Sequence, residues 1–134
     1  MRLRKDLTNC LKKRDILNNN GIDHGVLVEY GESFFELELY NDAVDFFEKA
    51  NYEEGLKEIK KLAIESGDLF LYRRCCKALK TKENTSELRE LAEKAKEAGK
   101  LMFASQAYLA LGEKSKAETL KEGLSPQTEV VGEA

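Results

Sequence analysis

Two segments of the chain repeat each other at an interval of 32 residues along the sequence. The first, 65–80, reads ESGDLFLYRRCCKALK, and the second, 97–112, reads EAGKLMFASQAYLALG. Further residues share this interval: Leu37, Leu69 and Leu101; Leu56, Leu88 and Leu120; Tyr40 and Tyr72; Gly67 and Gly99. A unit of this length has room for two helices and two turns, and one pair of helices cannot bury its apolar faces alone. The repetition therefore predicts stacked copies of a helical pair.

The composition and the turn signals favour helices throughout. The 134 residues are 35% charged and include one Pro and no Trp, with few of the β-branched runs that strands prefer. Apolar residues recur every three or four positions from 2 to 18, where NNNG follows. Asp68 and Asn84 are suited to begin helices, and Glu87 completes a capping-box pattern with Asn84. We therefore expect an all-α fold.

The length of the chain suggests a single domain over residues 1–122. The expected parts are an N-terminal capping helix within 1–21, helical hairpins over 26–122 and a flexible tail over 123–134. One boundary is open, because either a helix continues past Tyr40 or a tight turn falls at 40–42. That choice decides the phase of the repeats over 37–56, that is, which of these residues are equivalent to residues of the later units.

Two stretches carry the residue order of a known helical repeat. The matching residues are Leu27, Tyr30, Gly31, Phe34, Ala43, Phe47 and Ala50, and then Tyr108, Gly112 and Ala117. In this order of small and aromatic residues the chain resembles the tetratricopeptide repeat, whose period is about 34 residues. The resemblance implies a right-handed α-solenoid of about three antiparallel helix hairpins, whose first helices line a concave groove that holds a partner segment. The chain departs from the family in its slightly shorter unit and in having no Pro at the ends of the units.

Residues that carry chemistry are few. The single histidine, His24, lies in the predicted loop NNNGIDHGV, and Cys75 and Cys76 lie mid-helix, where adjacent side chains point about 100° apart. That arrangement suits neither a CxxC redox pair nor a closed zinc site, and packing in the core is the simpler interpretation. A reactive cysteine stays open, because the cations nearby would lower the pKa of an exposed thiol. We expect no catalytic, cofactor-binding or metal-binding residue and a non-enzymatic protein.

The sequence also bears on the location of the protein. No run approaches the roughly 18 apolar residues of a membrane span, and the charged start MRLRKDLTNCLKKR lacks the apolar stretch of a secretory signal. Three cysteines, an odd number, do not make a disulfide framework, which fits reduced thiols. We expect a cytoplasmic protein without a membrane partner.

The first copy of the repeated segment carries a run of cations that the second copy lacks. Arg73, Arg74, Lys77 and Lys80 fall within eight residues that contain no acid, and positions 73, 77 and 80 share one helix face. Arginine binds carboxylates through two parallel hydrogen bonds, and Asn41 is the counterpart of Arg73 one unit earlier. We predict a partner-binding set for an acidic protein or peptide at Asn41, Arg73, Arg74, Lys77 and Lys80. The alternative is a solvated basic face.

These features together predict a protein–protein interaction module that binds a partner protein or an acidic peptide in its groove. The alternative is a structural subunit of a homo-oligomer, since stacked hairpins end in open apolar faces. Phe35 or Phe70, if exposed, would mark a partner site or a self-association patch. Acidic residues crowd 29–58, where a docking surface for a basic partner is the alternative to a solvated face. The net charge of −3 and the lack of aromatic residues between the cations argue against nucleic acid.

Overall fold

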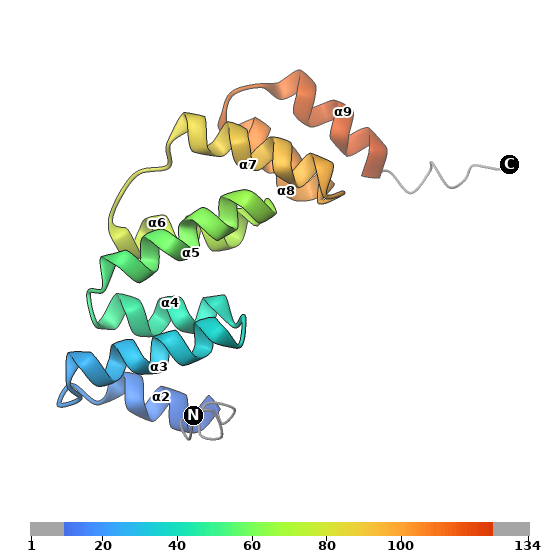
Figure 1. Cartoon of the computed structure of the whole chain (residues 1–134). Coiled ribbons are helices and arrows are strands. Elements are labelled where there is room, and N and C mark those ends of the chain that lie inside the picture. Colours follow the sequence, from blue (N-terminus) through green and yellow to red (C-terminus); the bar gives the residue numbers. More distant parts are fainter. Residues whose placement is uncertain (1–9, 125–134) are drawn as a thin grey trace, which may run out of the picture. The chain divides into compact units, whose positions relative to one another are not determined.

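The computed structural model describes residues 10–124, and within them all regular structure is helical (Figure 1). The helices are α2 (Cys10–Asn18), α3 (His24–Glu36), α4 (Tyr40–Lys49), α5 (Glu53–Ser66), α6 (Leu69–Leu79), α7 (Thr85–Glu97), α8 (Leu101–Ala110) and α9 (Lys114–Leu124). The prediction of an all-α fold is therefore confirmed. Residues 1–9 of the predicted capping helix, and 125–134 of the predicted tail, lie outside the described residues.

The chain divides into two compact units, and the division falls within α5 and α6. The first unit comprises 1–60 and 74–81, and the second comprises 61–73 and 82–134.

The first unit has an aromatic core where α3 packs against α4 (Figure 1). The ring of Phe46 stacks on Tyr30 and Phe34, with centroids 5.5 and 5.3 Å apart. Phe34, Phe46 and Phe47 are almost fully buried, and α2 also contacts α4. Offset stacking of this kind adds about 0.5–1.5 kcal/mol per pair to the burial of the rings.

In the second unit, the helix contacts around α8 contain many small side chains. Helix α8 packs against both of its chain neighbours, α7 and α9. The contacts within this unit therefore do not decide whether α8 forms a hairpin with α7 or with α9. The buried residues at these contacts include Leu88, Leu91, Ala92, Ala95, Ala104, Ala107 and Ala117. Short side chains let helix backbones approach, and Ser105 Oγ donates a hydrogen bond to the Ala117 carbonyl at 3.2 Å across the α8–α9 contact.

The turns recur at two different spacings. After α3, α5 and α7 the chain takes a positive φ at Glu38, Gly67 and Gly99. After α4, α6 and α8 it does so at Asn51, Lys80 and Gly112. In each of these two series, the first and second residues lie three residues closer together in the sequence than the second and third do. A left-handed residue just after a helix is the common way to end it, because it lets the last carbonyl groups accept hydrogen bonds.

The equivalence of Leu37 with Leu69, predicted from the interval of the repeat, is therefore wrong. Leu37 is the C-cap of α3 and is 37% exposed, whereas Leu69 is the first residue of α6 and is 0% exposed. The first residue of α4 is Tyr40, which occupies the place in its helical pair that Leu69 occupies in the next. Both alternatives for the turn near Tyr40 also miss its place, since the turn lies at 37–39.

The predicted helix starts at Asp68 and Asn84 are confirmed. Asp68 Oδ1 accepts a hydrogen bond from the Leu71 N–H at 3.1 Å, and Asn84 Oδ1 accepts from the N–H groups of Ser86 and Glu87. The Tyr72 hydroxyl donates to the Glu87 carboxylate at 2.9 Å and accepts from the Asn84 N–H at 3.0 Å. In a capping box the acidic side chain accepts a hydrogen bond from the N–H of the capping residue. Here the Tyr72 hydroxyl lies between the two groups and links the Asn84 N–H to the Glu87 carboxylate.

Candidate functional site

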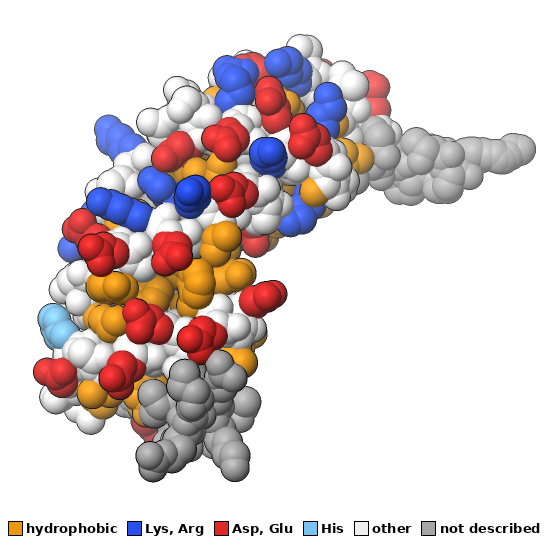
Figure 2. All heavy atoms as spheres, viewed as in Figure 1, with side chains coloured by type: hydrophobic (Ala, Val, Ile, Leu, Met, Phe, Trp, Pro, Cys, Tyr) orange, Lys and Arg blue, Asp and Glu red, His pale blue; other side chains and the backbone are white. Residues whose placement is uncertain are grey.

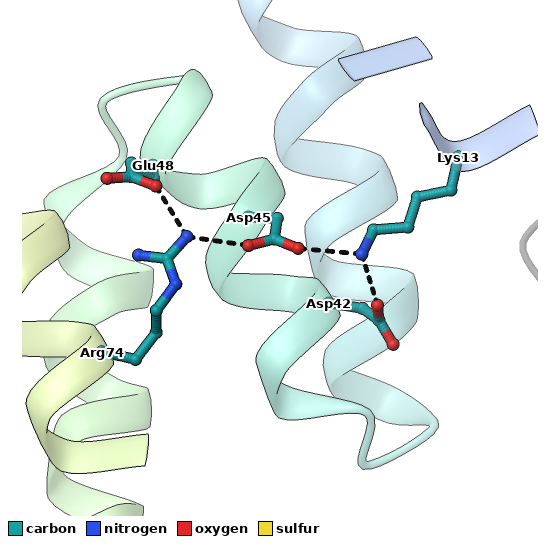
Figure 3. Close-up of polar contacts among 5 residues, drawn as sticks. All are labelled: Lys13, Asp42, Asp45, Glu48 and Arg74. Carbon is teal, nitrogen blue, oxygen red and sulfur yellow. Dashed lines mark hydrogen bonds and ion pairs between the residues drawn. The ribbon is translucent and has the colours of Figure 1, made fainter. Parts of the chain in front are cut away.

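The cations predicted to bind a partner are partly engaged within the molecule. The Arg74 guanidinium donates to Asp45 at 2.8 Å and to Glu48 at 2.7 Å, so α6 is tied to α4 in the first unit (Figure 3). Asp45 also accepts from Lys13 of α2 at 2.8 Å, and Lys13 reaches Asp42 at 2.5 Å. Burial alone would lower the pKa of Lys13 and that of Arg74, but the hydrogen bonds to these carboxylates outweigh it and both pKa values are raised. Arg74 therefore serves the fold, and its charge is already balanced.

The other predicted residues differ in their surroundings. In the second unit, Arg73 Nε lies 3.0 Å from Glu83 Oε2. In the first unit, Lys77 and Lys80 are exposed and form no ion pair with another described residue. Asn41 is exposed in the first turn of α4, and no hydrogen bond between described residues joins it to the α6 cations. Lys77 and Lys80 are thus the cations of the set that stay available to a partner.

The residues with chemical potential lie away from any common site. Cys75 and Cys76 are buried in α6, which agrees with the interpretation as core residues. His24 is exposed as the first residue of α3. Within 10–124, no group of His, Cys, Asp and Glu side chains is arranged to hold a metal ion, and no helix there is long and apolar enough to cross a membrane.

A cleft in the second unit, which we call the Tyr108 cleft, lies between α7 and α9 and has a volume of about 570 Å³. Its lining residues are Glu93, Lys96 and Glu97 of α7, Tyr108 of α8, and Lys116, Thr119 and Leu120 of α9. The Lys116 ammonium lies 5.4 Å from the centre of the Tyr108 ring. Volumes of about 300–1,000 Å³ are typical of sites that receive a small molecule or a few side chains.

An ion pair joins α7 to the residue that precedes α9. Arg89 of α7 pairs with Glu113 at 2.5 Å, and Lys116 lies 3.2 Å from the same carboxylate. The hydrogen bond from Arg89, followed by that from Lys116, lowers the pKa of Glu113. Lys116 therefore has a carboxylate partner near the α9 wall, while Lys96 makes no ion pair with the described residues.

The first unit carries an acidic surface around Tyr52. Figure 2 shows acidic side chains around an area of hydrophobic ones where α3, α4 and the start of α5 lie. Burial, and then the charges of Glu54, Glu32 and Glu58, raise the pKa of Tyr52. These carboxylates are therefore close enough to act on one ring, within the acidic stretch noted in the sequence.

A further exposed feature is the outer face of α8. The helix LMFASQAYLA contains no charged residue, and Met102 and Leu109 are 59% and 39% exposed. Phe70 of α6 is 64% exposed and packs edge-to-face on Phe103, with ring centroids 5.1 Å apart. Phe70 is therefore exposed, which is the condition under which a partner site or a self-association patch was expected there. Phe35 is half-buried against Tyr40.

Sequence reasoning missed the Tyr108 cleft and the uncharged face of α8. The cleft depends on how far apart α7 and α9 lie, which no local pattern reveals. The α8 face had a signal in the ten uncharged residues of the second repeated segment. The absence of charge in this segment was interpreted only as a lack of the cations that the first repeated segment carries.

Comparisons with protein-family models, with curated proteins and with solved structures find no match to the chain.

Proposed function

We propose that the chain is a protein–protein interaction module, built from tetratricopeptide-like helical pairs, that binds a segment of a partner protein in the Tyr108 cleft. The observation that carries the proposal is the cleft itself. It is large enough for one or two side chains, and it combines an aromatic ring and a leucine with two lysines. The module acts in the cytoplasm and without chemistry of its own.

The repeat architecture is supported by equivalent burial at the positions that the turns define. Phe47 lies nine residues after Glu38, and Tyr108 lies nine residues after Gly99. Both rings are buried, as are Leu27 and Leu88, each eleven residues before the same turn residue. Helical pairs that repeat in this way present side chains in a preformed arrangement, so a partner binds without a large cost in ordering the module.

The lining indicates the kind of segment that would bind. The side chain of Leu120, which lines the cleft together with the largely buried Tyr108, can accept an apolar residue, and the Lys96 ammonium can pair with a neighbouring carboxylate. Glu93 and Glu97 on the same wall would repel a longer acidic run. The partner segment therefore carries an apolar residue next to a single acidic one.

The experiment is selection of a random peptide library on the immobilised protein. We expect peptides with an adjacent apolar and acidic residue, and at least about tenfold weaker binding of them to the double variant Lys96→Gln and Lys116→Gln. The matched control is Lys121→Gln, an exposed lysine of α9 that does not line the cleft. Circular dichroism checks that each variant stays helical.

A second pair of variants tests the site predicted from the sequence. Lys77→Gln with Lys80→Gln removes the two cations of that set that have no ion pair among the described residues. Loss of peptide binding in this pair alone would move the site to α6, and unchanged binding in both pairs would refute the proposal.

A further inference from the structure

Helix α9 forms one wall of the Tyr108 cleft, and the chain leaves this helix close to the cleft. Lys116, Thr119 and Leu120 line that wall. The helix ends at Leu124, four residues after Leu120, which is about 6 Å along the helix axis. Residues 125–134, with the sequence SPQTEVVGEA, come next and lie outside the described residues. This segment therefore starts about one helical turn from a residue that lines the cleft.

The segment is long enough to reach the opposite wall of the cleft, which α7 forms. The five residues from Leu124 to Glu129 span at most about 17 Å when they are extended. This length exceeds the diameter of a helix with its side chains, which is about 10–12 Å. The carboxylate of Glu129 can therefore come to Lys96 of α7, which is exposed and makes no ion pair with another described residue.

The sequence of the segment has the chemistry that the lining of the cleft favours. Residues 128–131 read TEVV, so that Glu129 stands directly before two valines. The next acidic residue, Glu133, comes four positions later, and the segment thus has no acidic run for the carboxylates of α7 to repel. Glu129 suits the Lys96 ammonium, and a valine suits the half-buried side chain of Leu120.

The other end of the chain carries a similar pair in less suitable surroundings. Asp6 stands directly before Leu7, but Arg4 and Lys5 precede it. These two cations would face Lys96 as like charges, which weakens binding. The pair also belongs to the first unit, whereas the cleft belongs to the second. The segment that follows α9 is therefore the better occupant.

We propose that residues 128–131 occupy the Tyr108 cleft when no partner is bound, with the Glu129 carboxylate at the Lys96 ammonium and Val130 against Leu120. This inference rests on the proposed function and adds a means of regulation, because a partner segment must first displace the chain's own segment. A segment that a short linker joins to its site acts at an effective concentration in the millimolar range. Two weak contacts are therefore enough to hold it.

The occupied fraction sets the size of the effect. Apparent affinity for a partner is reduced by the fraction of molecules in which the site is free. If the segment fills the cleft in about two thirds to nine tenths of the molecules, partner binding is about three- to tenfold weaker than to an open cleft. An occupancy of this order competes with a partner without excluding it.

The first test measures binding of the peptides from the library selection to variants of the full chain. Glu129→Gln together with Val130→Ser should bind these peptides about three- to tenfold more tightly than the parent chain does. The matched control is Glu133→Gln, which removes the same charge from the same segment but stands between Gly132 and Ala134. It should bind like the parent, and circular dichroism checks that each chain stays helical.

The outcomes separate this inference from the proposed function. Equal binding by the parent and the double variant would overturn the inference, while the peptide binding itself would leave the proposed function in place. An equal gain in the double variant and in Glu133→Gln would also overturn it, because general charge repulsion would then explain the effect.

A second test needs no added peptide and therefore holds even if the library yields none. Backbone nuclear magnetic resonance signals of Lys96 and Glu93 on the α7 wall are compared between the parent and the variants. They should shift in the chain with Glu129→Gln and Val130→Ser, since the segment no longer covers the wall, and should stay in place in Glu133→Gln. Signals that coincide in all three chains would refute occupancy of the cleft by the segment.

Discussion

The two units surround the same buried ring position with different residues. In the first unit the Phe47 ring packs against Gly31 of α3 and Gly55 of α5, and a Cβ placed on Gly55 would come within 2.6 Å of that ring. In the second unit the matching ring, Tyr108, lines a cleft of about 570 Å³. Gly55 and Lys116 each lie four residues after the left-handed residue that precedes their helix.

The difference shows what opens or closes such a space. Glycines on both sides let two helices close on the ring, because no side chain keeps the backbones apart. A lysine at the same position holds its long side chain over the ring, which stays buried beside an open cleft. A module of repeated pairs can therefore be closed at one place and open for a partner at another through a change of one or two residues.

The largest expected effect is that of removing the ring itself. Phe47→Ala should lower the free energy of unfolding by about 3–5 kcal/mol, because it leaves a dry cavity among packed side chains. Tyr108→Ala should cost at least about 1 kcal/mol less, since water from the cleft can enter the space it leaves. Denaturant unfolding of both variants measures the two losses, and equal losses would show that the two sites are packed alike.

A methyl group at Gly31 should cost less than loss of the ring. Gly31→Ala should destabilise the chain by about 1–3 kcal/mol, because the added Cβ overlaps the Phe47 ring. Phe47→Leu, combined with Gly31→Ala, should recover part of the loss, which a double-mutant cycle would reveal as coupling. Independent, additive effects of the two substitutions would argue against the close contact.

The ion pairs of Arg74 should contribute less again. Arg74→Gln removes the bonds to Asp45 and Glu48 and should cost about 1 kcal/mol or less, since all three side chains are partly exposed to solvent. The loss should shrink in high salt, and the exposed control Lys77→Gln should stay within about 0.5 kcal/mol of the parent. A loss independent of salt would mean that the network acts through packing.

The smallest expected effect concerns acid and the Arg89–Glu113 ion pair. Arg89 lowers the folded-state pKa of Glu113, so the pair stabilises the fold above the unfolded pKa and is lost as the pH falls through the folded value. Unfolding free energy should therefore fall less steeply below about pH 4 in Glu113→Gln than in the parent chain. Identical pH profiles would show that the Arg89–Glu113 pair does not couple to folding.

The sequence predicted those helix ends that have a local chemical cause. Gly67 and Gly99 take the left-handed conformation that their type favours, and Asp68 and Asn84 cap helices with their side chains. Glu38 takes the same conformation without a residue type that announces it. The turn before α4 was therefore misplaced, although its two flanking helices were expected.

The first copy of the repeat was misaligned for a physical reason. A shift of three residues is close to one helical turn of 3.6 residues, so the apolar pattern stays nearly in phase and hides it. The ion pairs of Arg74 and the Tyr108 cleft were not predicted either, because both depend on which helices become neighbours. Charge runs and periodicity describe one helix at a time.

The measurement that tests the account most directly is a nuclear magnetic resonance titration of the full chain with a peptide from the library selection. We expect shifted backbone signals at Lys96, Lys116 and Leu120, which line the Tyr108 cleft, and unchanged signals at Gly31 and Gly55 around the closely packed ring of Phe47. Shifts centred on Gly31 and Gly55, with the cleft residues unaffected, would contradict it.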